Sequence, residues 1–110
     1  MIKELNTVTN TKKSFDENTE FDFQDFLDVC PFDMDELRKK NRKIEICEWR
    51  QIGMTWFAIH SNYITGSAIE FERDHTTVCH AMKQIQNRKF SKTLNEKVNA
   101  LLNYSENERK

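Results

Sequence analysis

Glycine and proline are scarce in this chain, with two glycines and one proline in 110 residues. A sheet of many strands needs the tight turns that these residues supply, whereas long segments here carry residues that favour helices. We therefore expect an all-α protein of about five to six helices. A chain of this length has room for one hydrophobic core and not for a second sizeable domain.

Apolar residues recur at spacings of three and four along most of the chain, which is typical of helices that bury one face. The first predicted helix begins near Glu20 and is ended or kinked by Pro31. Further helices are predicted over residues 33–39, 44–60, 65–71, a segment that opens at Asp74, and 92–103. Residues 1–18 are expected to form a flexible polar arm, 19–104 the folded domain and 105–110 a loose tail.

Two sets of side chains share the first predicted helix. The apolar set is Phe21, Phe23, Phe26 and Leu27, which can share a helical face, and its phenylalanines are expected in the core rather than in a ligand site. The acidic set is Asp22, Asp25 and Asp28. Its spacing follows the outer side of an amphipathic helix, so we interpret these acids as a solvated face and not as acid–base groups.

The long helix predicted over residues 44–60 contains Gly53 in its middle. Glycine inside a helix costs about 1 kcal/mol relative to alanine, so its presence indicates that another helix packs closely at that point. The apolar residues around it recur at helical spacing and are expected in the core: Trp49, Ile52, Trp56 and Ile59.

The overall charge of −1 conceals a strong asymmetry. Residues 1–37 carry three lysines and ten acids, whereas residues 38–110 carry fourteen basic residues and eight acids. The densest basic run, residues 38–43, contains no apolar residue and is expected to form a loop or a frayed helix end. A basic body favours a polyanionic partner, although an unevenly charged solvated surface would give the same counts.

Three widely spaced cysteines, Cys30, Cys47 and Cys79, indicate free thiols in a reducing compartment rather than a disulfide framework. The amino-terminal residues lack the apolar stretch of a signal peptide, and the apolar residues near Trp56 are too few to span a bilayer. A cytoplasmic protein without a membrane partner is expected.

The segments 65–71 and 74 onward, joined by a tight turn at Glu72 and Arg73, predict a helix-turn-helix. Asp74 is expected to cap the second helix by accepting hydrogen bonds from its first amides. His75, Thr76 and Thr77 then occupy the first turn, where short polar side chains can reach base edges in a major groove. Arg73 would meet a phosphate. Spacing alone equally permits a capped helix with solvated threonines.

The nine residues Arg73-Asp74-His75-Thr76-Thr77-Val78-Cys79-His80-Ala81 carry a more specific signal. They resemble the R-D-H-T-T-V-x-H-A signature of the C-terminal, Trp-repressor-like helix-turn-helix domain (domain IV) of the bacterial replication initiator DnaA. Upstream, Arg50-Gln51-Ile52-Gly53-Met54 is similar to that family's R-Q-(apolar)-(small)-M element, and the resemblance covers about residues 20–103.

The resemblance implies roles for individual residues. The positions that match base-reading residues in the major groove are Asp74, His75, Thr76 and Thr77. Those that match phosphate, minor-groove or thymine-methyl contacts are Arg42 or Lys43, Arg50, Gln51, Ile64 and Thr65, with Arg73 beside them. Three departures leave the preferred DNA sequence open. The family's minor-groove arginine falls nearer Ile44, Glu72 stands where the family has Gly-Gly, and residues 65–71 match poorly except at Phe71.

The expected function is sequence-specific binding of double-stranded DNA in replication initiation or its regulation. No phosphate-binding G-x-x-x-x-G-K-[ST] loop is present, so ATPase activity and catalysis are not expected, and no cofactor is expected. The alternative is a transcription regulator or an interaction module that competes with or binds the host initiator, with the acidic residues 1–37 as the surface for a replication protein. In another hypothesis the acidic arm covers the basic loop.

A metal or thiol site built from His75, Cys79 and His80, with or without Cys47, is the weakest alternative. His75 and Cys79 share a helical face, but His80 points about 100° away from Cys79 and no second ligand pair has finger-like spacing.

Overall fold

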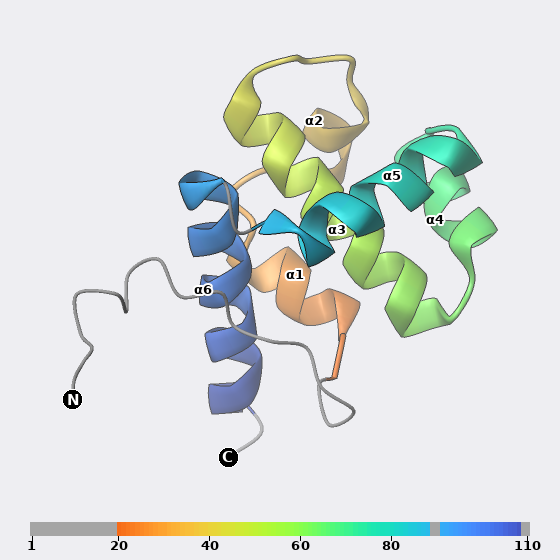
Figure 1. Cartoon of the computed structure of the whole chain (residues 1–110). Coiled ribbons are helices and arrows are strands. Elements are labelled where there is room, and N and C mark those ends of the chain that lie inside the picture. Colours follow the sequence, from red (N-terminus) through yellow and green to blue (C-terminus); the bar gives the residue numbers. More distant parts are fainter. Residues whose placement is uncertain (1–19, 89–90, 109–110) are drawn as a thin grey trace.

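The computed structural model describes residues 20–88 and 91–108, which form six α-helices without a strand in these two ranges. Helix α3 (Ile44–Ser61) lies at the centre and contacts every other helix (Figure 1). Around it pack α1 (Phe23–Val29), α2 (Met34–Arg38), α4 (Ile64–Phe71), α5 (His75–Gln86) and α6 (Lys92–Glu108). The all-α prediction is confirmed.

Helix boundaries follow the predicted segments closely, with one clear error at the carboxyl end. Helix α6 continues to Glu108, and Ser105 is buried, so residues 105–108 are not a loose tail. The hydroxyl of Ser105 donates to Asp25 Oδ2 at 2.7 Å, and this contact across 80 residues holds the last turns of α6 against α1. The predicted arm 1–18 and residues 109–110 lie outside the described residues.

Asp28 is exposed and Asp22 partly exposed, as the predicted solvated face requires, whereas Asp25 is buried and departs from it. Asp25 is 7 % exposed because it faces α6, where it accepts the Ser105 hydrogen bond. Asp28 accepts from the Tyr104 hydroxyl at 2.8 Å, and Asp22 caps α1 by accepting from Gln24 N at 3.0 Å. These carboxylates fix where α1 begins and where α6 docks.

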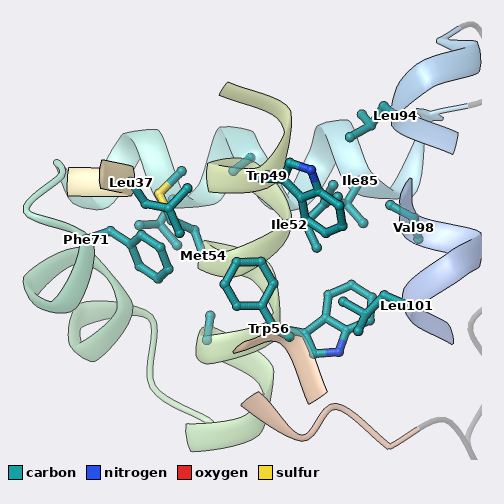
Figure 2. Close-up of a cluster of buried hydrophobic side chains, with 14 of the residues drawn as sticks. Leu37, Trp49, Ile52, Met54, Trp56, Phe71, Ile85, Leu94, Val98 and Leu101 are labelled. Atoms are coloured by element: carbon teal, nitrogen blue, oxygen red, sulfur yellow. The ribbon is translucent and has the colours of Figure 1, made fainter. Parts of the chain in front are cut away.

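The hydrophobic core surrounds α3 (Figure 2). Trp49, Ile52 and Trp56 are buried there as predicted, whereas Ile59 is only partly buried. Figure 2 shows these α3 side chains facing those of α5 and α6, and its labelled partners include Ile85, Val98 and Leu101. Burial of one face of each helix supplies the main stabilising energy.

Helices α1 and α4 approach α3 closely at Gly53, as the place of this glycine in the helix predicts. A Cβ atom at this position would lie 2.6 Å from Phe26 Cζ and 2.7 Å from Phe71 Cζ. Both phenylalanine rings are fully buried, one from α1 and one from α4. The missing side chain therefore allows α4, the first helix of the α4–α5 pair, to lie close to α3.

A buried carboxylate also holds the amino-terminal part of α6 against α3. Glu48 on α3 is 6 % exposed and accepts from Lys97 Nζ at 2.9 Å and from Thr93 Oγ1 at 2.8 Å. The Ser91 hydroxyl donates to the same carboxylate at 3.3 Å. Several hydrogen-bond donors around the Glu48 carboxylate offset the cost of removing its charge from water. The cluster therefore fixes the position of α6 along α3.

Candidate nucleic-acid interface

Helices α4 and α5 form a helix-turn-helix that packs on α3. The turn is tight because Glu72 adopts a left-handed conformation with φ 52°. Its amide donates to Ile69 O at 3.2 Å, and the next amide, of Arg73, donates to Ala68 O at 2.9 Å. This pair of bonds satisfies the last carbonyls of α4 and redirects the chain into α5.

The first turn of α5 presents polar side chains to solvent. Asp74, His75, Thr76 and Thr77 are all exposed. The opposite side of the helix buries Val78, Ala81 and Ile85 against the core. The amino end of α5 therefore projects, with its unpaired amides and the positive end of its dipole directed outward.

Asp74 occupies the N-cap position of α5, but its side chain makes no cap hydrogen bond. The predicted carboxylate cap is wrong in this respect. The position is exposed, so water competes with the amides for the carboxylate, and only the backbone carbonyl of Asp74 starts the helix, by accepting from Val78 N at 3.2 Å. The carboxylate is thus available to a partner.

Residues 39–43 form a loop between α2 and α3, as predicted, and we call it the basic loop. Lys40, Arg42 and Lys43 are exposed, and their side chains make no hydrogen bond or ion pair with residues 20–88 or 91–108. Asn41 shapes the loop, since its Oδ1 accepts from Lys43 N at 3.0 Å. Three uncompensated cations therefore project from one short segment.

Arg50 lies beneath the basic loop and not on the surface. It is 8 % exposed, and its guanidinium donates to Leu37 O at 2.7 Å, Lys39 O at 2.9 Å and Asn41 O at 3.2 Å. Direct phosphate contact, the role implied by the resemblance, is therefore revised. Helix α3 also begins at Ile44, so Arg50 lies well inside the helix and not at its first amides.

Arg73 is half-buried and is also occupied by main-chain carbonyls. Its Nη1 donates to Arg38 O at 3.0 Å and its Nη2 to Lys39 O at 2.9 Å. Burial lowers the pKa of the Arg73 guanidinium below its ordinary value, and the nearby Arg50 charge lowers it further. The phosphate contact predicted for Arg73 did not take these acceptors into account. Arg38 O and Lys39 O lie far from Arg73 in the sequence, so no local pattern indicates that they accept its hydrogen bonds.

Arg38, which ends α2, ties that helix to the helix-turn-helix. Its Nη2 lies 2.7 Å from Glu70 Oε2, and its Nε donates to Glu70 O at 2.8 Å. A shallow hollow beside this pair is lined by Asp35, Arg38, Lys39 and Glu72. The turn acid Glu72 thus lies next to the start of the basic loop.

The remaining candidates lie away from this junction. Thr65 is exposed and Ile64 packs on the core, both in the first turn of α4. Thr65 precedes Glu72 by seven positions, a rise of about 10 Å along α4. Gln51 is partly buried on α3. Arg73, which directly precedes Asp74–Thr77, donates to Lys39 O at the start of the basic loop, whereas Thr65 lies at the opposite end of α4.

The metal alternative gains no support from the geometry. His75 Nδ1 lies 4.0 Å from Cys79 Sγ, one turn along α5. Within the ranges that the structure describes, no group of three His, Cys, Asp or Glu side chains could hold an ion. In the same ranges, no helix has the length and apolar character needed to cross a membrane.

The acids of residues 20–37 are largely engaged within the domain. Besides the three in α1, Asp33 caps α2 by accepting from Glu36 N at 2.8 Å. Asp35 pairs with Arg38 at 3.4 Å, and Glu36 pairs with Lys39 at 3.5 Å. Asp28, Asp33 and Asp35 are nevertheless exposed, so the acidic segment as a surface for a protein partner stays a prediction.

Comparison with known proteins adds no relative, since no protein family, curated protein or solved structure matches this chain.

Proposed function

We propose that this protein binds double-stranded DNA sequence-specifically through the helix-turn-helix of α4 and α5, in replication initiation or its control and without ATPase activity. The observation that carries the proposal is a juxtaposition. The exposed first turn of α5 follows directly on Arg73, and Arg73 is hydrogen-bonded to the first residue of the basic loop. The exposed first turn of α5, which is the base-reading element in this proposal, is thus linked to the start of the loop that carries the exposed cations.

The chemistry of the first turn of α5 suits a major groove. Threonine offers a hydroxyl and a methyl group that contacts thymine, and histidine donates or accepts a hydrogen bond. The uncapped carboxylate of Asp74 can accept from the amino group of cytosine. The cations of the basic loop suit phosphates or a narrow minor groove, where the negative potential is strongest. The link to replication rests on the resemblance of residues 73–81 to the DnaA signature.

Selection of bound duplexes from a random pool, followed by affinity measurements on the selected site, tests the proposal. His75→Ala and Thr76→Ala should each weaken binding by about 1–3 kcal/mol and relax the preference for one or two bases. Arg42→Ala should instead weaken binding to all duplexes and lower the slope of log K against log salt by about 1.

Asn107→Ala supplies the control, because Asn107 is exposed near the end of α6, at the other side of the molecule from the start of α5 (Figure 1). It should bind as the wild type does. A pool without enrichment, or His75→Ala and Thr76→Ala variants with wild-type affinity and preference, would contradict DNA reading by α5.

A further inference from the structure

The short helix α2 ends without intrahelical partners for its last carbonyls, as every helix does. Here the missing donors come from two arginines of other elements. Leu37 O accepts from Arg50, and Arg38 O accepts from Arg73. Lys39 O accepts from both, at 2.9 Å in each case. Cationic donors at a helix carboxyl end are also favoured by the helix dipole.

The carbonyl of Lys39 joins three elements: the end of α2, helix α3 and the turn before α5. Arg50 belongs to α3, and Arg73 lies two residues before the first residue of α5. Asn41 O accepts a further bond from Arg50, so the contacts extend two residues into the basic loop. The start of α5 and the path of the loop are therefore fixed with respect to each other by main-chain acceptors.

We infer that Arg50 and Arg73 are positioning residues for DNA binding, which hold the basic loop in a preset path relative to α5. The inference rests on the proposed function. The exposed cations of the loop and the first turn of α5 then meet one duplex in a fixed register. A loop that is already ordered loses less conformational freedom on binding, so its cations contribute more to affinity.

Two other roles would leave different signatures. An arginine that contacts a phosphate directly contributes to affinity whether or not the loop carries charge. An arginine that only stabilises the fold changes the melting temperature without changing the affinity of the folded protein. A positioning residue acts through the loop, so its effect on affinity requires the loop cations.

The first measurement needs no DNA. Trypsin cleaves after exposed Lys and Arg when the chain is mobile, and the loop contains Lys40, Arg42 and Lys43. Cleavage in the loop should be about tenfold faster in Arg73→Met than in wild type, because proteolysis follows the population of locally opened chain. Lys83→Met, an exposed site on α5, is the control and should cleave as the wild type does. Equal loop cleavage in Arg73→Met and wild type would overturn the preset path.

The second measurement is a double-mutant cycle on the selected duplex. Arg73→Met should weaken binding about tenfold in the wild-type background and less than about twofold in a background with Lys40→Gln, Arg42→Gln and Lys43→Gln. The same factor in both backgrounds would show a direct phosphate contact and overturn the inference. Unchanged affinity in both would show a purely structural arginine and overturn it as well.

Arg50→Met is the second variant, with melting curves recorded to establish that each protein is folded at the assay temperature. It should show the same dependence on the loop cations as Arg73→Met. If the wild type binds no duplex, the proposed function fails and the positioning role fails with it, whereas DNA binding that is insensitive to both arginines refutes the positioning role alone.

Discussion

Replacement of Gly53 by alanine should destabilise the protein, although alanine is the better helix former. The added Cβ would lie 2.6 Å from Phe26 Cζ, 2.9 Å from Phe26 Cε2 and 2.7 Å from Phe71 Cζ. Both rings are fully buried, so neither can turn away into solvent. Relief requires α1 or α4 to move outward from α3.

The size of the effect follows from two opposing contributions. Overpacking a filled core costs roughly 1–3 kcal/mol, and the change from glycine to alanine inside a helix returns about 1 kcal/mol. Because the clash involves two buried rings from different helices, the cost belongs near the upper limit. The expected net loss in the free energy of unfolding is about 2 kcal/mol.

Equilibrium unfolding in urea measures this loss. With an m-value on the order of 1.5 kcal/mol/M, the midpoint should fall by about 1.3 M. Gly66→Ala is the matched control: its Cβ would approach Tyr63 Cδ2 at 2.9 Å, but Tyr63 is 58 % exposed and can move aside. Gly66→Ala should therefore be neutral or raise the stability by up to about 1 kcal/mol. If Gly53→Ala and Gly66→Ala change the free energy of unfolding by the same amount and with the same sign, the close-packing explanation is refuted.

Three further outcomes are expected. In a Tyr63→Phe protein, ultraviolet titration of Tyr104 should show a pKa of about 12, since its hydroxyl donates to a carboxylate. That bond stabilises the fold below pH 10 and is lost as the pH rises through 12, so Tyr104→Phe should flatten the stability profile there. Glu48→Ala should cost roughly 3–5 kcal/mol in urea unfolding, whereas exposed Glu45→Ala should cost less than about 0.5 kcal/mol. Glu72→Gly should stabilise by roughly 0.5–1 kcal/mol by relieving the left-handed residue. Under the proposed function it should also tighten DNA binding by removing an acid beside the start of the basic loop, and weaker binding would contradict this.

Periodicity located the helices because burial of one face dictates their spacing. The segments around Trp56, Val78 and Val98 were therefore predictable, and so was the close approach at Gly53. The extension of α6 was not, because it depends on a hydrogen bond from Ser105 to an acid 80 residues earlier. A polar residue gives no sign in the sequence of the distant partner that buries it.

The part of the candidate site that depends on neighbouring residues in the sequence was predictable. A tight turn followed by short polar residues indicates the exposed start of α5 without knowledge of the core. The arginines were misplaced for the opposite reason. The phosphate role of Arg50 came from the resemblance to the R-Q element, whereas in the structure Arg50 is buried and donates to carbonyls that a five-residue helix leaves without donors. Only the fold shows where those acceptors lie.

The two arginines bind the main chain of residues 37–41 and none of the side chains that project from the basic loop. The shape of this segment is thus encoded outside it, in α3 and in the turn before α5. Exchange of Lys40, Arg42 or Lys43 should leave the backbone unchanged, so these three positions form a natural place to graft new side chains and redirect the domain to other targets.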